Sequence, residues 1–141
     1  RPGTVFICTP SDASHLPLAE EFGLTPLPWA QRHDVAARLV VNTTPLGMRG
    51  KAEQDSPYDF SLAKPLAPAS DANATPIAYD IVYNPLETRF LREARAAGRR
   101  CISGLEMFFG QGDAQFRLWT GQGLPPESRR ALEAALGQQG Q

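Results

Sequence analysis

The sequence predicts an α/β fold in which a parallel sheet is covered by helices on both faces. Apolar, β-branched segments alternate along the chain with segments of helical periodicity. The helical segments begin at residues that cap helices well and end at glycines. The 141 residues, 42% of them apolar, fit one ordinary globular domain with its own core.

The first elements are a strand at Thr4 to Cys8, a helix that ends at Gly23, and a short strand within 24–29. Ser14 is the expected N-cap of this helix, and Pro17 is tolerated because it falls in the first turn. Gly23 suits the left-handed position that follows a helix. The second strand is expected at a sheet edge, because its prolines cannot donate to a ladder.

A continuous apolar strand is expected within 37–44, of the kind that is buried on both faces of a parallel sheet. The following residues, 49–76, are rich in Pro, Ala, Ser, Asp and Lys and show little periodicity. They are expected to form a long surface connection with one short helix near 61–66.

Residues 77–83 form the next expected strand, and a well-punctuated helix follows it. Asn84 is the expected N-cap, Pro85 takes the first helical position, Glu87 completes a capping box, and Gly98 ends the helix. The apolar face of this helix is expected to hold Leu86, Phe90, Leu91, Ala94 and Ala97.

A strand at 99–103 and a helix that begins at Ser103 come next, and Ser103 and Glu106 have the spacing of a capping box. A last helix is expected at 125–136. In the helix that begins at Ser103, an apolar stripe is expected to face the sheet, with Phe108 and Trp119 in the core. The stripe consists of Leu105, Phe108, Gly112, Phe116 and Trp119.

Composition argues against several classes of function. The formal net charge is -1, and no basic stripe with interleaved aromatic residues is present, so nucleic acid is not an expected partner. No apolar run approaches the ~20 residues that span a bilayer, so we expect a soluble, cytoplasmic protein without a membrane partner. Cys8 and Cys101 are expected to be buried thiols and not metal ligands. His15 and His33 lack ligand spacing and are expected at the surface or at caps.

Polar residues follow the strand within 37–44, where "VVNTTPLGMRG" leaves its apolar run. In parallel sheets, ligands bind outside the carboxyl ends of the strands, so this loop is a candidate site. The alternative is that Thr43, Thr44 and Pro45 only form a tight turn. A glycine fingerprint of the G-x-G-x-x-G type, which would identify a pyrophosphate site, does not occur.

Four segments resemble the C-terminal, nucleotide-binding domain of the shikimate dehydrogenase family: "NTTPLGM", "YDIVYNPLETRFL", "ISGLEMFFGQ" and "QFRLWTG". The resemblance extends roughly from Val5 to Gly121. The last two segments are also similar to the final domain of fused, multifunctional enzymes of the shikimate pathway. The resemblance implies a Rossmann-like fold that lacks the usual first βα unit, so that 1–141 is a partial dinucleotide-binding domain.

The implied function is NADPH-dependent reduction of 3-dehydroshikimate to shikimate in aromatic amino-acid biosynthesis. Quinate remains an alternative to shikimate as the preferred acid. The alternative function is a nucleotide-binding or regulatory module of the same family without catalysis.

The resemblance also assigns cofactor residues. Asn42 and Thr44 belong to the loop that closes over the cofactor, and Thr44 matches the family threonine near the nicotinamide ribose. Ile81 is implied to lie beside the nicotinamide. Gly104 is implied to let the carboxamide approach the backbone, and Met107 to pack on the nicotinamide ring.

Tyr83 and Gln111 are the implied substrate-binding residues. Strand alternation places Ile81 and Tyr83 on one side, and helical spacing places Gly104, Met107 and Gln111 on one face. Both patterns suit a shared site. For Tyr83, the alternative is a tyrosine at a strand end with its hydroxyl in solvent.

The chain departs from the family at a turn that normally carries an Arg for the 2′-phosphate of NADP. This turn falls on 9–11, where Thr9 and Ser11, with Asp12 after them, are the expected cofactor contacts. We therefore expect NADP, with NAD as the alternative. Asp12 either accepts from a ribose hydroxyl, which favours NAD, or starts the helix. Arg32 and Arg49 are the candidates to replace the missing Arg.

The family's glycine-rich loop, its first nucleotide-binding strand, and the N-terminal domain with the catalytic Lys and Asp have no counterpart here. We therefore expect no catalytic residue in this chain, no activity of the chain alone, and an N-terminal domain of the same protein as its partner. Either the strand at 4–8 pairs directly with the strand at 39–42, or another segment supplies the central strand.

Overall fold

The computed structural model describes residues 3–66 and 75–138. These residues form two compact units: a first unit of residues up to 36 together with 62–66, and a second unit of 37–61 and 75–138. The expectation of one partial dinucleotide-binding domain over 1–141 stays a prediction. The division follows from the sheets, because the strands form a two-stranded and a three-stranded sheet that share no strand.

In the first unit, β1 (Phe6–Ile7) pairs in parallel with β2 (Thr25–Pro26). The helix α1 (Leu16–Phe22) connects them, and a short 3₁₀ turn, η1 (Trp29–Gln31), follows β2. Gly23 ends α1 in the left-handed conformation with φ 63°, as the sequence predicts. The predicted N-cap is wrong: His15 occupies that position and its side chain makes no cap hydrogen bond.

The second unit contains β3 (Leu39–Asn42), β4 (Ile77–Asp80) and β5 (Arg100–Ile102), which form a parallel sheet in that order. Asn42 is in register with Asp80, and Tyr79 with Ile102, so the strands end along one edge of the sheet. The parallel α/β class is confirmed. Direct pairing of the strand at 4–8 with the strand at 39–42 is wrong, since β1 pairs with β2.

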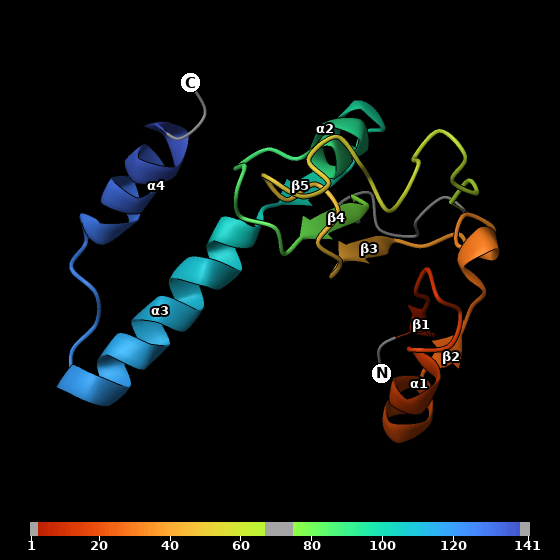
Figure 1. Ribbon diagram of the computed structural model, residues 1–141, viewed down its shortest axis with the longest axis horizontal. Coiled ribbons are helices and arrows are strands. Elements are labelled where there is room, and N and C mark those ends of the chain that lie inside the picture. The colour runs from red at the N-terminus through yellow and green to blue at the C-terminus, as the bar shows by residue number, and fades with distance from the viewer. Residues whose placement is uncertain (1–2, 67–74, 139–141) are drawn as a thin grey trace. The chain divides into compact units, whose positions relative to one another are not determined.

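The helix α2 (Arg89–Ala96) covers one face of this sheet (Figure 1). Its residues Phe90 and Leu91 are buried, and Phe90 packs on Phe60 with ring centroids 5.2 Å apart. Phe60 in turn contacts Tyr58, and both rings are buried. The segment that contains them was expected to be a surface connection, and its part up to residue 66 instead supplies core.

Residues 61–66 contain one turn residue and one bend and are otherwise irregular, so the short helix expected there is wrong. Residues 67–74 of the expected connection lie outside the described residues. The opposite face of the sheet carries Leu39 and Val41, which are 54% and 42% exposed. The expectation that this strand is buried on both faces is wrong, because the face with Leu39 and Val41 is exposed, whereas α2 packs on the other face of the sheet at β4 and β5.

The helix α2 begins later than its sequence punctuation predicts. Thr88 is the N-cap, and its Oγ1 accepts a hydrogen bond from the Leu91 N–H. Asn84 and Pro85 are joined by a cis peptide bond and lie in the bend that precedes the helix. Their predicted roles as N-cap and first helical residue are therefore wrong, because Thr88 supplies the side-chain cap instead. Gly98, with φ 75°, follows the helix as predicted.

The helices α3 (Gly104–Thr120) and α4 (Ser128–Gln138) complete the second unit. The predicted capping box at the start of α3 is wrong, because Ser103 makes no side-chain cap and Glu106 pairs with Arg129 of α4. Trp119 is 78% exposed, so its predicted core role is also wrong. Among the described residues, no helix combines the length and apolar character needed to cross a membrane.

Candidate functional site

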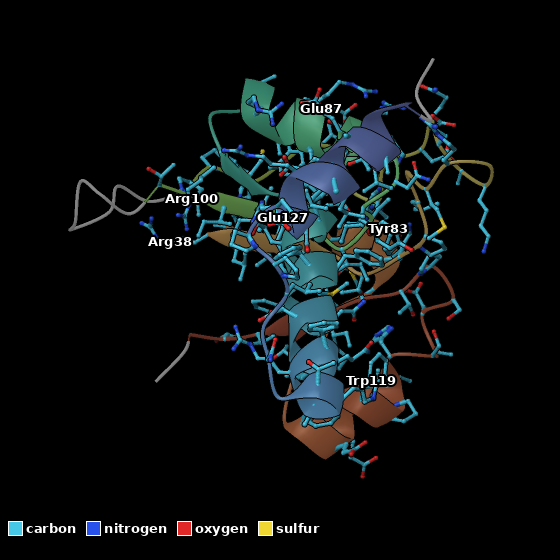
Figure 2. The ribbon with its side chains drawn as sticks, turned by 90° about the vertical axis from the view of Figure 1, so that its left-hand side faces the viewer. Arg38, Tyr83, Glu87, Arg100, Trp119 and Glu127 are labelled. Atoms are coloured by element: carbon cyan, nitrogen blue, oxygen red, sulfur yellow. The ribbon has the colours of Figure 1, made fainter. Side chains whose placement is uncertain are left out.

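The candidate site lies at the edge of the second unit where β3, β4 and β5 end. Figure 2 shows Arg38 and Arg100 at the opposite end of this sheet, where the strands begin, and Tyr83 at the end where they finish. The loops that follow these strands carry Thr44, Ile81 and Tyr83, three of the residues that the sequence assigns to cofactor and substrate. Loops in this position present side chains to ligands in open α/β sheets.

The loop after β3 is held by the side chain of Asn42, which is buried. Its Oδ1 accepts hydrogen bonds from the Thr44 N–H at 2.9 Å and from the Thr44 hydroxyl at 2.7 Å. Its Nδ2 donates to the carbonyl of Leu46 at 3.1 Å and to Asp80 Oδ1 at 2.9 Å. The tight turn expected at Thr43, Thr44 and Pro45 is therefore present. The Asn42 amide is buried and holds this loop by hydrogen bonds instead of facing solvent.

Asp80 and Thr88 complete a buried polar network that sequence reasoning missed. Asp80 is fully buried and accepts hydrogen bonds from Asn42, from the Val82 N–H at 3.0 Å and from the Thr88 hydroxyl at 2.5 Å. Burial raises the pKa of the Asp80 carboxyl, and these hydrogen bonds offset part of that effect. The available signal was an Asp inside the otherwise apolar run "IAYDIVY".

The loop after β4 carries Ile81 and Tyr83, both half-buried. The Ile81 N–H donates to the Asn42 carbonyl at 3.1 Å, which joins this loop to the end of β3. The ring of Tyr83 stacks on Phe108 of α3, with centroids 4.4 Å apart. Among the described residues, nothing hydrogen-bonds to the Tyr83 hydroxyl. This hydroxyl is therefore available to a ligand.

The first turn of α3 sits directly on the loop after β4. A Cβ atom added at Gly104 would lie 2.3 Å from the Ile81 carbonyl oxygen and 2.5 Å from that of Val82. Only a glycine fits such an approach. The need for Gly104 thus has a packing reason that is independent of any cofactor.

Met107 and Gln111 share the helix face of Gly104, and both are exposed, Met107 to 36%. The structure therefore brings Thr44, Ile81 and Tyr83 together with the start of α3 in one unit. Phe108, which was expected in the core, is half-buried and forms the ring contact with Tyr83.

The remaining candidates, Thr9, Ser11 and Asp12, lie in a turn of the first unit. The Thr9 hydroxyl contacts His15 Nδ1 at 2.9 Å. His15 is only 2% exposed and occupies the N-cap position of α1, so of the two expected places, surface or cap, it takes the cap. Asp12 adopts a left-handed φ of 52°, and its carboxylate accepts from the Trp29 N–H at 2.5 Å. Asp12 therefore fixes the turn to the segment after β2 and does not cap α1.

Arg32 lies close to this turn within the first unit. Its guanidinium stacks over Trp29 at 4.3 Å and donates to the Trp29 carbonyl at 2.7 Å. Burial raises the pKa of the Cys8 thiol, and the positive charge of Arg32 offsets part of that rise. Arg49, the other candidate, belongs to the second unit, where its N–H donates to the Asn84 carbonyl at 3.0 Å. Over the part of the chain that is described, no cluster of side chains could hold a metal ion.

A family model and two curated relatives that match this chain are all of the shikimate dehydrogenase type. Residues 104–131 match the family model of the shikimate 5'-dehydrogenase C-terminal domain. A shikimate dehydrogenase (NADP(+)) of Pelobacter propionicus is 53% identical over 125 residues, which cover 89% of this chain and 42% of that protein. The corresponding protein of Thermus thermophilus is 43% identical over 122 residues, 83% of this chain and 41% of its own length.

Solved structures resemble the chain to a similar extent. Shikimate 5-dehydrogenase of Thermus thermophilus, in complex with NADP(H) and shikimate, has a TM-score of 0.72 at 36% identity and covers 94% of this chain and 46% of that one. Quinate dehydrogenase of Corynebacterium glutamicum, in complex with NAD, has a TM-score of 0.74 at 26% identity, with the same coverage. The chain spans less than half the length of these relatives.

Proposed function

We propose that this chain, which belongs to the shikimate dehydrogenase family and is similar to its C-terminal domain, forms the nucleotide-binding half of an NADP-dependent shikimate dehydrogenase. The reaction is the NADPH-dependent reduction of 3-dehydroshikimate to shikimate. The longer protein that this proposal implies is the parent protein. A supporting fact is that the P. propionicus relative is more than twice as long as the segment that matches.

The observation that carries the proposal is the meeting of the loop after β4 with the start of α3. Gly104 is seated against the Ile81 and Val82 carbonyls, and Tyr83 stacks on Phe108. Because Phe108 follows Met107 in α3, this ring contact supports a site shared by the Tyr83 hydroxyl and the helix face that carries Met107 and Gln111. An apolar surface for a flat ring and donors for a polyhydroxylated acid thus lie next to each other.

The residues at this edge fit a nicotinamide nucleotide. The thioether of Met107 and the side chain of Ile81 offer soft apolar contacts for the nicotinamide ring. Thr44 would contact the nicotinamide ribose through its backbone or methyl group, because its hydroxyl already donates to Asn42 and accepts from the Leu46 N–H. Asn42 would act by holding this loop. When bound, NADP supplies or accepts the hydride.

Tyr83 and Gln111 would bind the substrate. A phenol hydroxyl and a side-chain amide can each donate to and accept from the ring hydroxyls of shikimate. We assign both groups to the orientation of the acid and neither to proton transfer. The proton that accompanies the hydride is assigned to the Lys and Asp of the family's N-terminal domain, which has no counterpart in these 141 residues.

Within the first unit, the turn at Thr9, Ser11 and Asp12 is our proposed set of further cofactor contacts. The Thr9 and Ser11 hydroxyls are close to each other at 3.3 Å and could reach a phosphate or ribose together. Arg32 is our candidate for the 2′-phosphate contact. We further propose a cytoplasmic enzyme whose partners are its small-molecule substrate and its own N-terminal domain, and not nucleic acid or membrane.

The test is an initial-rate assay of the purified parent protein with NADP+ and either shikimate or quinate. We expect reduction of NADP+ with shikimate, and a lower rate for Tyr83→Phe, which removes only the hydroxyl. Leu62→Ala, an exposed change outside the proposed site, is the matched control and should leave the rate unchanged. A parent protein that binds NADPH but reduces nothing would instead favour the non-catalytic module.

A further inference from the structure

Asp80 is a buried carboxylate that lies between the two loops of the proposed site. Its side chain is 0% exposed. Within the described part of the chain, its partners are hydrogen-bond donors only, and it forms no ion pair. A carboxylate in such surroundings is costly unless its oxygens are well satisfied. The hydrogen-bond partners of the Asp80 oxygens therefore indicate the role of this residue.

One set of contacts holds the loop after β3. The amide of Asn42 donates to Asp80 Oδ1 and to the Leu46 carbonyl, while its oxygen accepts twice from Thr44. Gly47, with φ 92°, approaches Thr88 so closely that an added Cβ would lie 3.2 Å from the Thr88 side chain. Asn42, at the start of this loop, is thus hydrogen-bonded to Asp80. Gly47, near its end, packs against Thr88, which is another partner of Asp80.

A second set of contacts holds the loop after β4. Asp80 Oδ1 accepts from the Val82 N–H, and Oδ2 accepts from the Thr88 hydroxyl that also caps α2. Residues between Asp80 and Thr88, which include Tyr83, are therefore fixed at both ends by the same carboxylate. The Arg49 N–H donates to the Asn84 carbonyl and adds a link between the two loops.

We propose that Asp80 is a positioning residue that sets the relative placement of Thr44, on the nucleotide side, and Tyr83, on the substrate side. This inference rests on the proposed function. Asp80 contacts neither nucleotide nor substrate, because it is buried beneath both loops. Its role is to give the two binding loops one shared anchor, so that the reacting groups are held in a fixed geometry.

The experiment compares Asp80→Ala, Asp80→Asn and the control Asp59→Asn in the parent protein. Asp80→Ala removes both oxygens and should raise the Kd for NADP+ and the KM for shikimate by roughly tenfold each, because small misplacements of bound groups are costly. Asp80→Asn keeps an oxygen for Asn42 and Val82 and should stay within about twofold of wild type. Asp59 is exposed, and its substitution should change neither constant.

A merely structural role would lower the melting temperature and leave both constants unchanged in the folded variant, and that result would overturn the proposal. If Asp80→Ala does not fold, Thr88→Val replaces it, since this change keeps the side-chain shape and removes one donor. It should raise the KM for shikimate by roughly threefold, a typical effect of one hydrogen bond. An unchanged KM would contradict the anchor.

Amide hydrogen exchange separates this inference from the proposed function. In the parent protein, Asp80→Ala, or Thr88→Val in its place, should speed exchange in both 42–48 and 81–87, and Asp59→Asn should not. Faster exchange in both loops supports a shared anchor even if the wild-type protein does not oxidise shikimate. Unchanged exchange, or a change in only one loop, overturns it.

Discussion

At the scale of single residues, the side chains of the proposed site divide into those already committed within the protein and those still available. Asn42 and the Thr44 hydroxyl are committed to the turn, and Asp12 is committed to the Trp29 N–H. Gln111, by contrast, is exposed and has no hydrogen-bond partner within the described residues. Available groups can bind ligands at little cost to stability, which leads to the first prediction.

Gln111→Ala should impair substrate use without unfolding the parent protein. The loss of one hydrogen bond should raise the KM for shikimate roughly three- to tenfold. The melting temperature should change by only about 1 to 2 °C, as for other exposed substitutions. Steady-state kinetics and a thermal melt give both values. Gln115→Ala, one turn further along α3, should be silent; a large melting shift for Gln111→Ala with normal kinetics would refute the assignment.

Arg32→Ala should reduce the preference for NADP over NAD. A charge-assisted contact to the 2′-phosphate is worth about 1.5 to 3 kcal/mol, so the ratio of kcat/KM for the two nucleotides should fall roughly ten- to hundredfold. Arg49→Ala should leave this ratio unchanged. If the Arg32 variant keeps the wild-type ratio, another group contacts the 2′-phosphate.

The buried Asp80 carboxyl should make stability depend on pH. Burial raises its pKa in the folded protein. Its contribution to stability is therefore fully present below the unfolded pKa, about 3.9, and is lost as the pH rises through the higher folded pKa. Asp80→Asn does not titrate. The free energy of unfolding of this variant should therefore increase relative to that of wild type as the pH rises from about 4 to neutrality. Urea denaturation over this range tests the sign, and a difference that shrinks with pH would contradict it.

At the scale of elements, the contact between α3 and the loop after β4 depends on Gly104, which has no side chain. Gly104→Ala would place a Cβ 2.3 Å from the Ile81 carbonyl oxygen, so α3 must shift. Such overpacking costs about 1 to 3 kcal/mol. We expect a lower melting temperature and a raised KM for shikimate, because Tyr83 and Gln111 would move apart.

Gly110→Ala is the matched control for this prediction, because a Cβ at Gly110 in the same helix meets no neighbouring atom. It should stabilise α3 by about 0.5 to 1 kcal/mol, since alanine favours helix. If both variants melt at or above the wild-type temperature, α3 does not depend on Gly104 for its seat.

The success of sequence-based prediction differed between the two ends of each helix. Gly23, Gly98 and Gly121 all adopt positive φ at or just after helix ends, because a left-handed residue there has few substitutes for glycine. Helix starts were less certain, since several polar residues compete for the cap. Thr88 is the N-cap of α2 in place of Asn84, because its hydroxyl also donates to Asp80. No local sequence pattern reveals this contact.

Burial was the other quantity that local patterns could not give. The apolar run of β3 is the same whether one face or both are covered, and only the tertiary structure leaves Leu39 and Val41 half-exposed. Likewise, Tyr58 and Phe60 lie in a segment of loop composition, yet they pack against Phe90 of α2. The candidate residues were found through family motifs. Their proposed anchor, Asp80, shows in the sequence only as a polar residue in an apolar run, and its hydrogen bonds to Asn42 and Thr88 follow from no local pattern.

At the scale of the whole molecule, the chain forms two units and leaves large apolar side chains exposed. Val41 is 42% exposed and Leu118 84%. Exposed apolar groups of this size often mark contact surfaces. Since the chain spans less than half of its relatives, the parent protein is expected to supply both the missing surface and the chemistry.

The most direct test of this account is shikimate-dependent reduction of NADP+ in two purified samples, the parent protein and the isolated 141-residue chain. The parent protein should turn over, because it joins the binding residues described above to the catalytic Lys and Asp of the family. The isolated chain should show no turnover above a heat-inactivated control. Turnover by the isolated chain, or none by the parent protein, would contradict the division of labour proposed for this domain.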